Sequence, residues 1–262
     1  MQITLIVEGS HLFLPMNQSG LTVVSYGGTY RGRRANNEDS LGRTIPHDRQ
    51  ALDQKGRFYA VSDGMGGVNG GEVASRMAIE VTMECYYALR GSNEECLKTA
   101  IRQASAMISA RAREDTGLAQ MGATLVSIAV LKSSLLYAHV GDSRLYLLRE
   151  GCLHRLTRDH LHILETLGLT EAEADSHPQR NILSRALGYP DSCHPDLESM
   201  DIAPGDCFLL CTDGLTDCVH PDIVKASLSL PTPKEAVDSL ISAATLFKAR
   251  DNATALVIFI LP

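Results

Sequence analysis

The chain has 262 residues, of which 44% are hydrophobic, enough for one large globular domain or two small ones. Its formal net charge of −7 argues against nucleic acid as a main partner, because phosphate backbones need a basic face. The same acidity suits a protein that gathers cations.

Seven cysteines at irregular spacings, without a C-x-x-C pair, predict reduced thiols in a cytoplasmic protein rather than disulfides. No apolar run reaches the ~20 residues needed to cross a bilayer, so we expect no membrane span. Residues 1–21 lack the basic start of a signal peptide. We expect them to form an N-terminal extension to a main domain at 22–262.

The first half of the main domain shows short β-prone runs, polar segments, and then two stretches of helical periodicity. In chain order, we expect a strand at 21–30 that ends at Gly27–Gly28, a turn-rich segment at 43–56, a strand at 58–62, a helix from the following glycine-rich turn to about Leu89, and a second helix opened by the capping box of Ser92 and Glu95. The two consecutive helices can pack antiparallel on a sheet.

The second half begins with β-branched runs and ends with a helix and a strand. We expect an antiparallel meander of Ala123–Leu131, Ser134–Val140, Arg144–Arg149 and Cys152–Leu156, a polar segment at 158–190, a hairpin of 198–202 and 206–212 around Pro204–Gly205, a helix from the Thr232 cap to about Lys248, and a strand at Ala253–Leu261. This order predicts an α+β fold in which helices pack on antiparallel sheets.

Asp63 follows the 58–62 strand directly and precedes five glycines within eight positions. An aspartate carried to the rim of an apolar core needs a partner that makes its charge tolerable. Taken alone, the segment leaves two partners open. A metal ion would use Asp63 and a nearby carbonyl, whereas a phosphate would use the glycine-loop amides and the helix N-terminus.

Further aspartates stand at strand ends, where a lone Asp-Gly is usually only a turn. They are Asp142, Asp213 and Asp251, together with Asp39, which follows Glu38 in an arginine-rich segment. If the sheet edges gather these carboxylates into one cleft, they cannot all stay ionised without a cation among them. Oxygen ligands favour Mg²⁺ or Mn²⁺.

Two such ions about 4 Å apart, sharing one carboxylate, would direct an activated water at a phosphorus atom. Arg34, five residues before Asp39, could grip two phosphate oxygens, although Arg31, Arg33 and Arg34 could equally form a solvated loop. No zinc motif is present, and the spacings of the histidines at 154, 160, 162 and 177 are not typical of metal ligands.

At these residues the sequence resembles the phosphatase 2C family of metal-dependent serine/threonine protein phosphatases, in its compact bacterial form. The matching stretches, in the order of the family, are Arg34–Asp39, Val61–Gly67, Gly71–Ser75, Met121–Leu125, His139–Arg144, Leu156–His160, His177–Gly188, Leu210–Leu215 and Asp251–Thr254. The resemblance covers about residues 22–260. It implies a central antiparallel β-sandwich flanked by pairs of antiparallel helices, with the metal site at one edge and a flap at about 158–181.

The resemblance also implies a role for each site residue. Asp63 would bridge two Mn²⁺ or Mg²⁺ ions as a catalytic group, and the Gly64 carbonyl would bind one of them. Asp213 and Asp251 would hold the other ion, Asp39 would act directly or through water beside Glu38, and Asp142 would help to hold a third, weaker ion. Arg34 would bind the phosphate of the substrate.

The implied activity is hydrolysis of phosphoserine and phosphothreonine in proteins, opposing a Ser/Thr protein kinase. One departure from the family concerns the general acid, because many eukaryotic members have a histidine where this chain has Met65. The leaving group would then take its proton from another donor.

Two other functions fail on the residues themselves. A dinucleotide-binding domain lacks its G-x-G-x-x-G spacing in the loop 64–71, since position 69 is Asn. A cysteine phosphatase built on Cys152 and Arg158 lacks the glycines of an anion-binding loop. An inactive phosphatase-like module that only binds phosphoproteins stays open as the alternative, although a module that had lost its metals would have little reason to keep so many aspartates.

Overall fold

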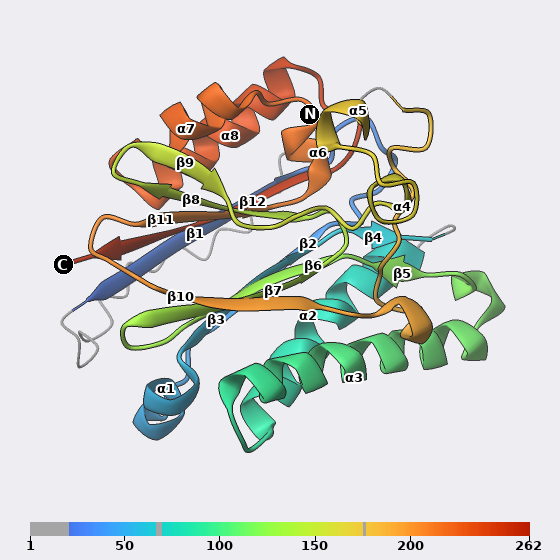
Figure 1. Ribbon diagram of the computed structural model, residues 1–262, viewed down its shortest axis with the longest axis horizontal. Helices are drawn as coiled ribbons and strands as arrows, with labels where there is room; N and C mark the ends of the chain where they lie inside the picture. Colours follow the sequence, from blue (N-terminus) through green and yellow to red (C-terminus); the bar gives the residue numbers. More distant parts are fainter. Residues whose placement is uncertain (1–20, 67–69, 175–176) are drawn as a thin grey trace.

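The computed structural model describes residues 21–66, 70–174 and 177–262. It shows two five-stranded antiparallel sheets packed face to face, with a helix pair on each outer side (Figure 1). One sheet has the strand order β1 (Thr22–Tyr30), β12 (Ala253–Leu261), β11 (Cys207–Cys211), β8 (Arg144–Arg149), β9 (Cys152–Arg155). The other has the order β10 (Asp196–Asp201), β7 (Ser134–Val140), β6 (Leu125–Val130), β3 (Arg57–Ser62), β2 (Ser40–Thr44).

The helices lie outside the sandwich. Helices α2 (Gly70–Ala88) and α3 (Asn93–Glu114) cover the second sheet, and α7 (Pro221–Leu228) and α8 (Pro233–Leu246) cover the first (Figure 1). The short elements are α1 (Arg49–Lys55), α4 (His162–Glu165), α5 (Glu171–Ala174), α6 (Asp213–Thr216) and the paired strands β4 (Gly64–Met65) and β5 (Gly122–Ala123). The predicted α+β sandwich is confirmed.

Three apolar layers hold these parts together. Side chains such as Val61, Ile128 and Phe208 fill the space between the sheets, and separate clusters fill the space under each helix pair. Strands β3 and β11 are buried along their whole length because both of their faces are covered. Within the described residues, no helix is long and apolar enough to cross a membrane.

The predicted hairpin of 198–202 and 206–212 is wrong. Strand β10 pairs with β7 in one sheet, whereas β11 pairs with β8 and β12 in the other, so the chain crosses between the sheets at Pro204–Gly205. The turn residues do form a turn, but burial decides the pairing. Strand β11 is buried on both faces, as a central strand requires, while β10 is mostly exposed and lies at an edge.

The prediction of a single meander over 123–156 is also wrong, because here too the chain crosses from one sheet to the other. Strands β6 and β7 pair in one sheet and β8 and β9 in the other. The change of sheet occurs at Gly141, whose backbone has φ +101°, a conformation that favours glycine. This crossover turn carries Asp142 to the edge of the sandwich.

Several boundaries also differ from the prediction. Strands β7, β8 and β12 have their predicted bounds, and Ser92 and Thr232 cap α3 and α8 as expected. The polar segment 43–56, however, contains helix α1, capped by the Asp48 side chain, and strand β2 precedes it. Residues 158–181 contain α4 and α5, which pack on a small core of their own. The predicted extension, residues 1–21, lies outside the described residues except for Leu21.

Strand β1 does not end at Gly27–Gly28 but continues to Tyr30. Helix α8 packs on β1, and a Cβ atom at Gly28 would lie only 2.8 Å from Cγ1 of Val237 on that helix. The glycine is therefore needed for close helix packing inside the strand rather than for a turn.

We expect Gly28→Ala to lower the free energy of unfolding by about 1–3 kcal/mol, because the new methyl group overpacks the contact with Val237. Val237→Ala should make room for that methyl group. A double-mutant cycle in urea would measure the coupling. Additive effects of the two substitutions would contradict this account of Gly28.

Candidate active site

The fold brings the predicted aspartates to one edge of the sandwich. Asp63 follows β3 and Asp142 follows β7, while Asp213 follows β11 and Asp251 stands just before β12. Strands β11 and β12 are antiparallel neighbours, so the end of one lies beside the beginning of the other, and β3 and β7 both pair antiparallel with β6, so their ends lie at the same edge. Asp39 precedes β2 and so lies beside the end of β3.

A cleft of about 600 Å³ opens at this edge. Six of the seven predicted site residues line it: Arg34, Asp63, Gly64, Asp142, Asp213 and Asp251. The seventh, Asp39, is not part of the lining. Its Oδ2 accepts hydrogen bonds from the hydroxyls of Thr212, at 2.9 Å, and Thr254, at 2.6 Å.

Glycines let the backbone approach closely at the floor of the cleft. A Cβ at Gly64 would lie 2.0 Å from the carbonyl oxygen of Gly71, and a Cβ at Gly71 would lie 2.7 Å from that of Gly64. The pairing of β4 with β5 fixes Gly64 from the other side. The Gly64 backbone is therefore held at the cleft wall, beside Asp63.

Thr124 fixes the backbone of Asp63. The Asp63 N–H donates to Thr124 Oγ1 at 2.9 Å, and the Thr124 N–H donates to the Asp63 carbonyl, also at 2.9 Å. The Thr124 hydroxyl is in turn 2.7 Å from that of Ser143, the residue after Asp142. One hydroxyl network thus links the loops that carry two of the carboxylates.

The carboxylates raise one another's pKa values. Burial, with the charges of Asp213 and Asp251, raises the pKa of Asp39 to about 7, despite its two hydroxyl hydrogen bonds. Burial, with the charges of Asp217 and Asp251, raises the pKa of Asp213 to about 6. Burial is also the main cause that raises the pKa of Asp63, together with the neighbouring aspartates.

Asp142 behaves in the same way, because burial and the charge of Asp213 raise its pKa well above the ordinary value. Two buried oxygens of the cluster, Asp39 Oδ1 and Asp213 Oδ1, accept no hydrogen bond from the described part of the protein. Free carboxylate oxygens among like charges are what a hard divalent cation would bind, so the donor set fits Mg²⁺ or Mn²⁺.

Arg34 lies at the mouth of the cleft. Its Nη2 donates to Asp251 Oδ2 at 2.5 Å, and its side chain is 60% exposed. A guanidinium in this position can use its remaining N–H groups for an anion in the cleft. Sequence analysis did not foresee the ion pair with Asp251.

Asn252 is a positioning residue that sequence analysis named only as part of a motif. Its Nδ2 donates to the carbonyls of Arg31, at 2.8 Å, and Asn36, at 3.0 Å, and its Oδ1 accepts from the Glu38 N–H at 2.8 Å. A single side chain thus ties the arginine-rich segment to the strand end that carries Asp251. The signal was its place directly after an aspartate that stands before a strand.

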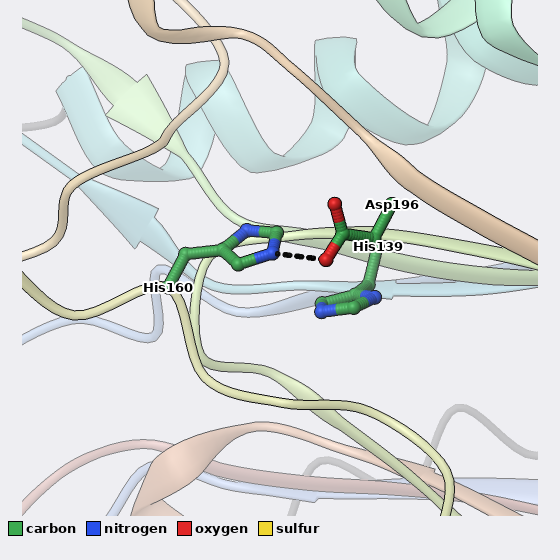
Figure 2. Close-up of side chains that lie close together, drawn as sticks. All are labelled: His139, His160 and Asp196. Atoms are coloured by element: carbon green, nitrogen blue, oxygen red, sulfur yellow. Dashed lines mark hydrogen bonds and ion pairs between the residues drawn. The ribbon is translucent and has the colours of Figure 1, made fainter. Parts of the chain in front are cut away.

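A second cluster, of His139, His160 and Asp196, lies next to the Asp142 loop (Figure 2). The two imidazole rings stack with centroids 4.4 Å apart, and His160 Nε2 lies 3.1 Å from Asp196 Oδ2. His139 and Asp196 face each other across β7 and β10. Sequence analysis did not find this cluster, because its members come from three separate segments.

The hydrogen bonds argue against a metal ion between these groups. His160 Nδ1 accepts from the Gly141 N–H at 3.1 Å, so the neutral ring carries its proton on Nε2, which faces Asp196. A metal at Nε2 would displace that proton and break the pattern. Arg185 already places a cation there, since its Nη1 lies 2.7 Å from Asp196 Oδ1.

His160 instead holds the turn before Asp142. Besides the bond to Nδ1, its own N–H donates to the Gly141 carbonyl at 3.0 Å. Burial and the neighbouring His139 lower the pKa of His160 to about 4, which keeps the ring neutral and able to accept from Gly141. The cluster therefore fixes a cleft-lining loop from behind.

Comparison with known proteins agrees with this site. A family model described as protein phosphatase 2C matches residues 27–257. The chain belongs to the protein phosphatase 2C family. The serine/threonine phosphatase stp of Listeria welshimeri is 36% identical over 243 residues, which cover 88% of this phosphatase and 93% of the relative.

Solved structures give the same result. The crystal structure of the serine/threonine phosphatase Stp1 from Staphylococcus aureus matches with a TM-score of 0.82 and 29% identity, over 98% of this chain and 100% of that one. The catalytic domain of the phosphatase PstP, solved in complex with two manganese ions, matches with a TM-score of 0.77 and 31% identity, over 92% and 100% of the two chains. The resemblance inferred from the nine sequence stretches is confirmed.

The raised carboxyl pKa values predict an unusual pH dependence without metal. Because the folded state holds these protons more tightly than the unfolded state, its stability falls as pH rises through the raised values. In EDTA, we expect the Tm to fall by about 5 °C between pH 7 and 8.5, and Mn²⁺ to restore it. The buried histidines contribute little to stability changes in this range, because their pKa values lie below it.

Thermal unfolding of the wild type and of Asp142→Asn would test this. The substitution removes one of the titrating groups, so the Tm in EDTA should depend less on pH. Asp222→Asn, on the exposed end of α7, is the matched control and should keep the wild-type slope. A wild-type Tm that rises with pH in EDTA would contradict the electrostatic account of the cluster.

Proposed function

We propose that this phosphatase hydrolyses phosphoserine and phosphothreonine in proteins with two divalent cations, Mn²⁺ or Mg²⁺, bound in the cleft. The observation that carries the proposal is the convergence of four buried or half-buried aspartates on one cleft, with an arginine at its mouth and unpaired carboxylate oxygens on Asp213 and the adjacent Asp39. Membership of the family and the phosphatase relatives support the activity over the alternative of an inactive binding module. The retained carboxylates support it too, because such a costly cluster has no use in a module that binds no metal.

Each site residue has a proposed task. Asp63 would bridge the two cations, the Gly64 carbonyl would bind one of them, and Asp213 and Asp251 would hold the second. Asp142, on the turn fixed by His160, is proposed to help hold a third ion. Bound cations would activate a water molecule at neutral pH and offset the negative charge of the phosphate.

The protein groups around the cations would orient the substrate. Arg34 would bind non-bridging phosphate oxygens, while Asp39, held by the hydroxyls of Thr212 and Thr254, would bind a cation directly or through water. Met65 lines the cleft and has no proton to donate, so the leaving-group oxygen takes its proton from another donor. The segment at about 158–181 would act as the flap, and Asn181, in its described part, contributes to the lining of the cleft.

The wider role is part of the same proposal. A protein phosphatase of this kind would act in the cytoplasm, in signal transduction, on the targets of a Ser/Thr protein kinase or on the kinase itself. Seven free thiols support a reducing compartment. Residues 1–21 are proposed to be an extension to the catalytic domain.

Asp63→Asn should abolish the activity while the fold survives. Replacing the bridging carboxylate by an amide removes a charge that both cations need, so we expect kcat/KM to fall by about 1000-fold or more. Mn²⁺-dependent hydrolysis of p-nitrophenyl phosphate and of a phosphothreonine peptide would measure the loss, and calorimetry would measure metal binding. Retained activity, with Asp222→Asn as the control, would refute the bridging role.

Arg34→Ala should mainly raise KM. Loss of a charge-assisted contact with phosphate costs about 1.5–3 kcal/mol, which corresponds to about 10–100-fold in KM for a phosphopeptide. Metal affinity should stay within a few fold, because Asp251 keeps its place through Asn252. Arg90→Ala, an exposed arginine on the link between α2 and α3, is the control. Unchanged peptide kinetics would exclude the phosphate clamp.

A further inference from the structure

A surface of cations and apolar side chains lies beside Arg34, at the mouth of the cleft. It combines the arginine-rich segment with the residues that follow helix α8: Arg31, Arg33, Leu246, Phe247, Lys248 and Arg250. We call these six residues the α8 rim. All six are exposed, and the first two are separated from the other four by more than 200 positions in the sequence.

The two segments of the α8 rim are in contact. A Cβ at Gly32 would lie 2.1 Å from the carbonyl oxygen of Asp251 and 2.9 Å from that of Ala249, so their backbones touch. The carbonyl of Arg31 also accepts a hydrogen bond from Asn252. The rim therefore adjoins both Arg34 and Asp251, the residues at the mouth of the cleft.

The charge of the rim is opposite to that of the chain. Four cations gather here in a protein with a net charge of −7, and within the described residues Arg31, Arg33, Lys248 and Arg250 form no ion pair. Because these side chains are exposed and form no ion pair with any described residue, their positive charges remain available to a partner molecule. A negatively charged segment of a partner would complement them.

Apolar side chains are exposed at the same place. Leu246 is 74% exposed and Phe247 is 48% exposed, and they are consecutive in the chain. Leu246 is the most exposed large hydrophobic side chain in the described part of the protein. The partner should therefore carry an apolar group as well as negative charge.

Lys248 stands in a backbone conformation that does not favour lysine. The Lys248 N–H donates to the Thr245 carbonyl and the Ala249 N–H to the Ala244 carbonyl, which is the Schellman pattern of a helix C-terminus. Lys248 occupies the left-handed position of this pattern, with φ +58°, which glycine fills best. The chain carries a lysine where glycine would be more stable.

We propose that the α8 rim is a docking surface for the substrate chain, and that it selects phosphoproteins with acidic and apolar residues next to the phosphorylated residue. This inference rests on the proposed phosphatase function and adds a substrate class to it. The phosphate would enter the cleft at Arg34, while the flanking segment lies along Arg33, Phe247 and Lys248. Such contacts should act on substrate affinity and weaken as salt concentration rises.

The test compares three phosphothreonine peptides that differ only in the flank: Asp/Glu with Leu and Phe, Ser/Gly, and Lys/Arg with Leu and Phe. At low salt, we expect kcat/KM with Mn²⁺ to be about 10-fold higher for the acidic–apolar peptide than for the Ser/Gly peptide, through KM. The basic peptide should be the poorest substrate. The advantage should shrink at 0.5 M NaCl.

Two double variants separate the contributions of charge and of apolar contact to the peptide preference. Lys248→Gly/Arg250→Gln should remove most of the charge preference without strain, since glycine suits position 248, and Leu246→Ser/Phe247→Ser should remove the apolar part. Both should hydrolyse p-nitrophenyl phosphate within about twofold of the wild type. Arg90→Gln, remote from the cleft, is the matched control and should keep the wild-type preference.

The outcomes distinguish this inference from the proposed function. Equal kcat/KM for the three peptides, or an equal loss on all of them in the variants, overturns the docking surface while phosphatase activity stands. A dimer that Leu246→Ser/Phe247→Ser abolishes, with unchanged peptide preference, assigns the surface to a second copy of this chain instead. If no substrate is hydrolysed, the proposed function fails. In that case, fluorescence anisotropy with the unphosphorylated acidic–apolar peptide still tests the docking surface. Binding that the rim variants weaken supports it, and equal binding by the wild type and the variants overturns it.

Discussion

The repulsion among carboxylates at one edge of the sandwich is the constraint on which this protein depends. Antiparallel strands from both sheets end there, and burial together with this repulsion raises the pKa values of Asp39, Asp63, Asp142 and Asp213. Such a cluster destabilises the folded state, because each buried charge costs free energy. The three apolar layers therefore offset a local instability that protonation or bound cations relieve.

Close backbone contacts keep this strained edge in one geometry. A Cβ at Gly214 would lie 1.9 Å from the Asn252 carbonyl oxygen, so the segment after Asp213 touches the segment after Asp251, much as Gly64 touches Gly71. Side chains then fix the loops from behind, Thr124 for Asp63 and His160 for Asp142. If these carboxylates bind metal ions as proposed, such rigid supports mean that they lose little freedom on binding, which favours affinity.

The sequence could predict the fold class and the gathering of the aspartates, because strand ends and apolar runs are local signals. It could not predict which strands pair. Pro204–Gly205 specifies a turn but not whether the chain returns to the same sheet, and only the burial of β11 on both faces decides that. Long-range contacts were missed for the same reason: Gly28 accommodates a helix about 200 residues away, and the cluster of His139, His160 and Asp196 needs three segments to meet.

Asn252 shows how the same edge connects chemistry with recognition. Its side chain holds the carbonyls of Arg31 and Asn36 and the N–H of Glu38, while its neighbour Asp251 pairs with Arg34. The segment that carries the arginine proposed to bind phosphate is therefore attached to the strand end that carries a proposed metal ligand. Since the α8 rim touches that segment at Gly32, a substrate flank bound there lies against the backbone that positions both groups. Substrate docking and phosphate binding then share one rigid support, so a well-placed flank favours the correct phosphate position without any movement of the site.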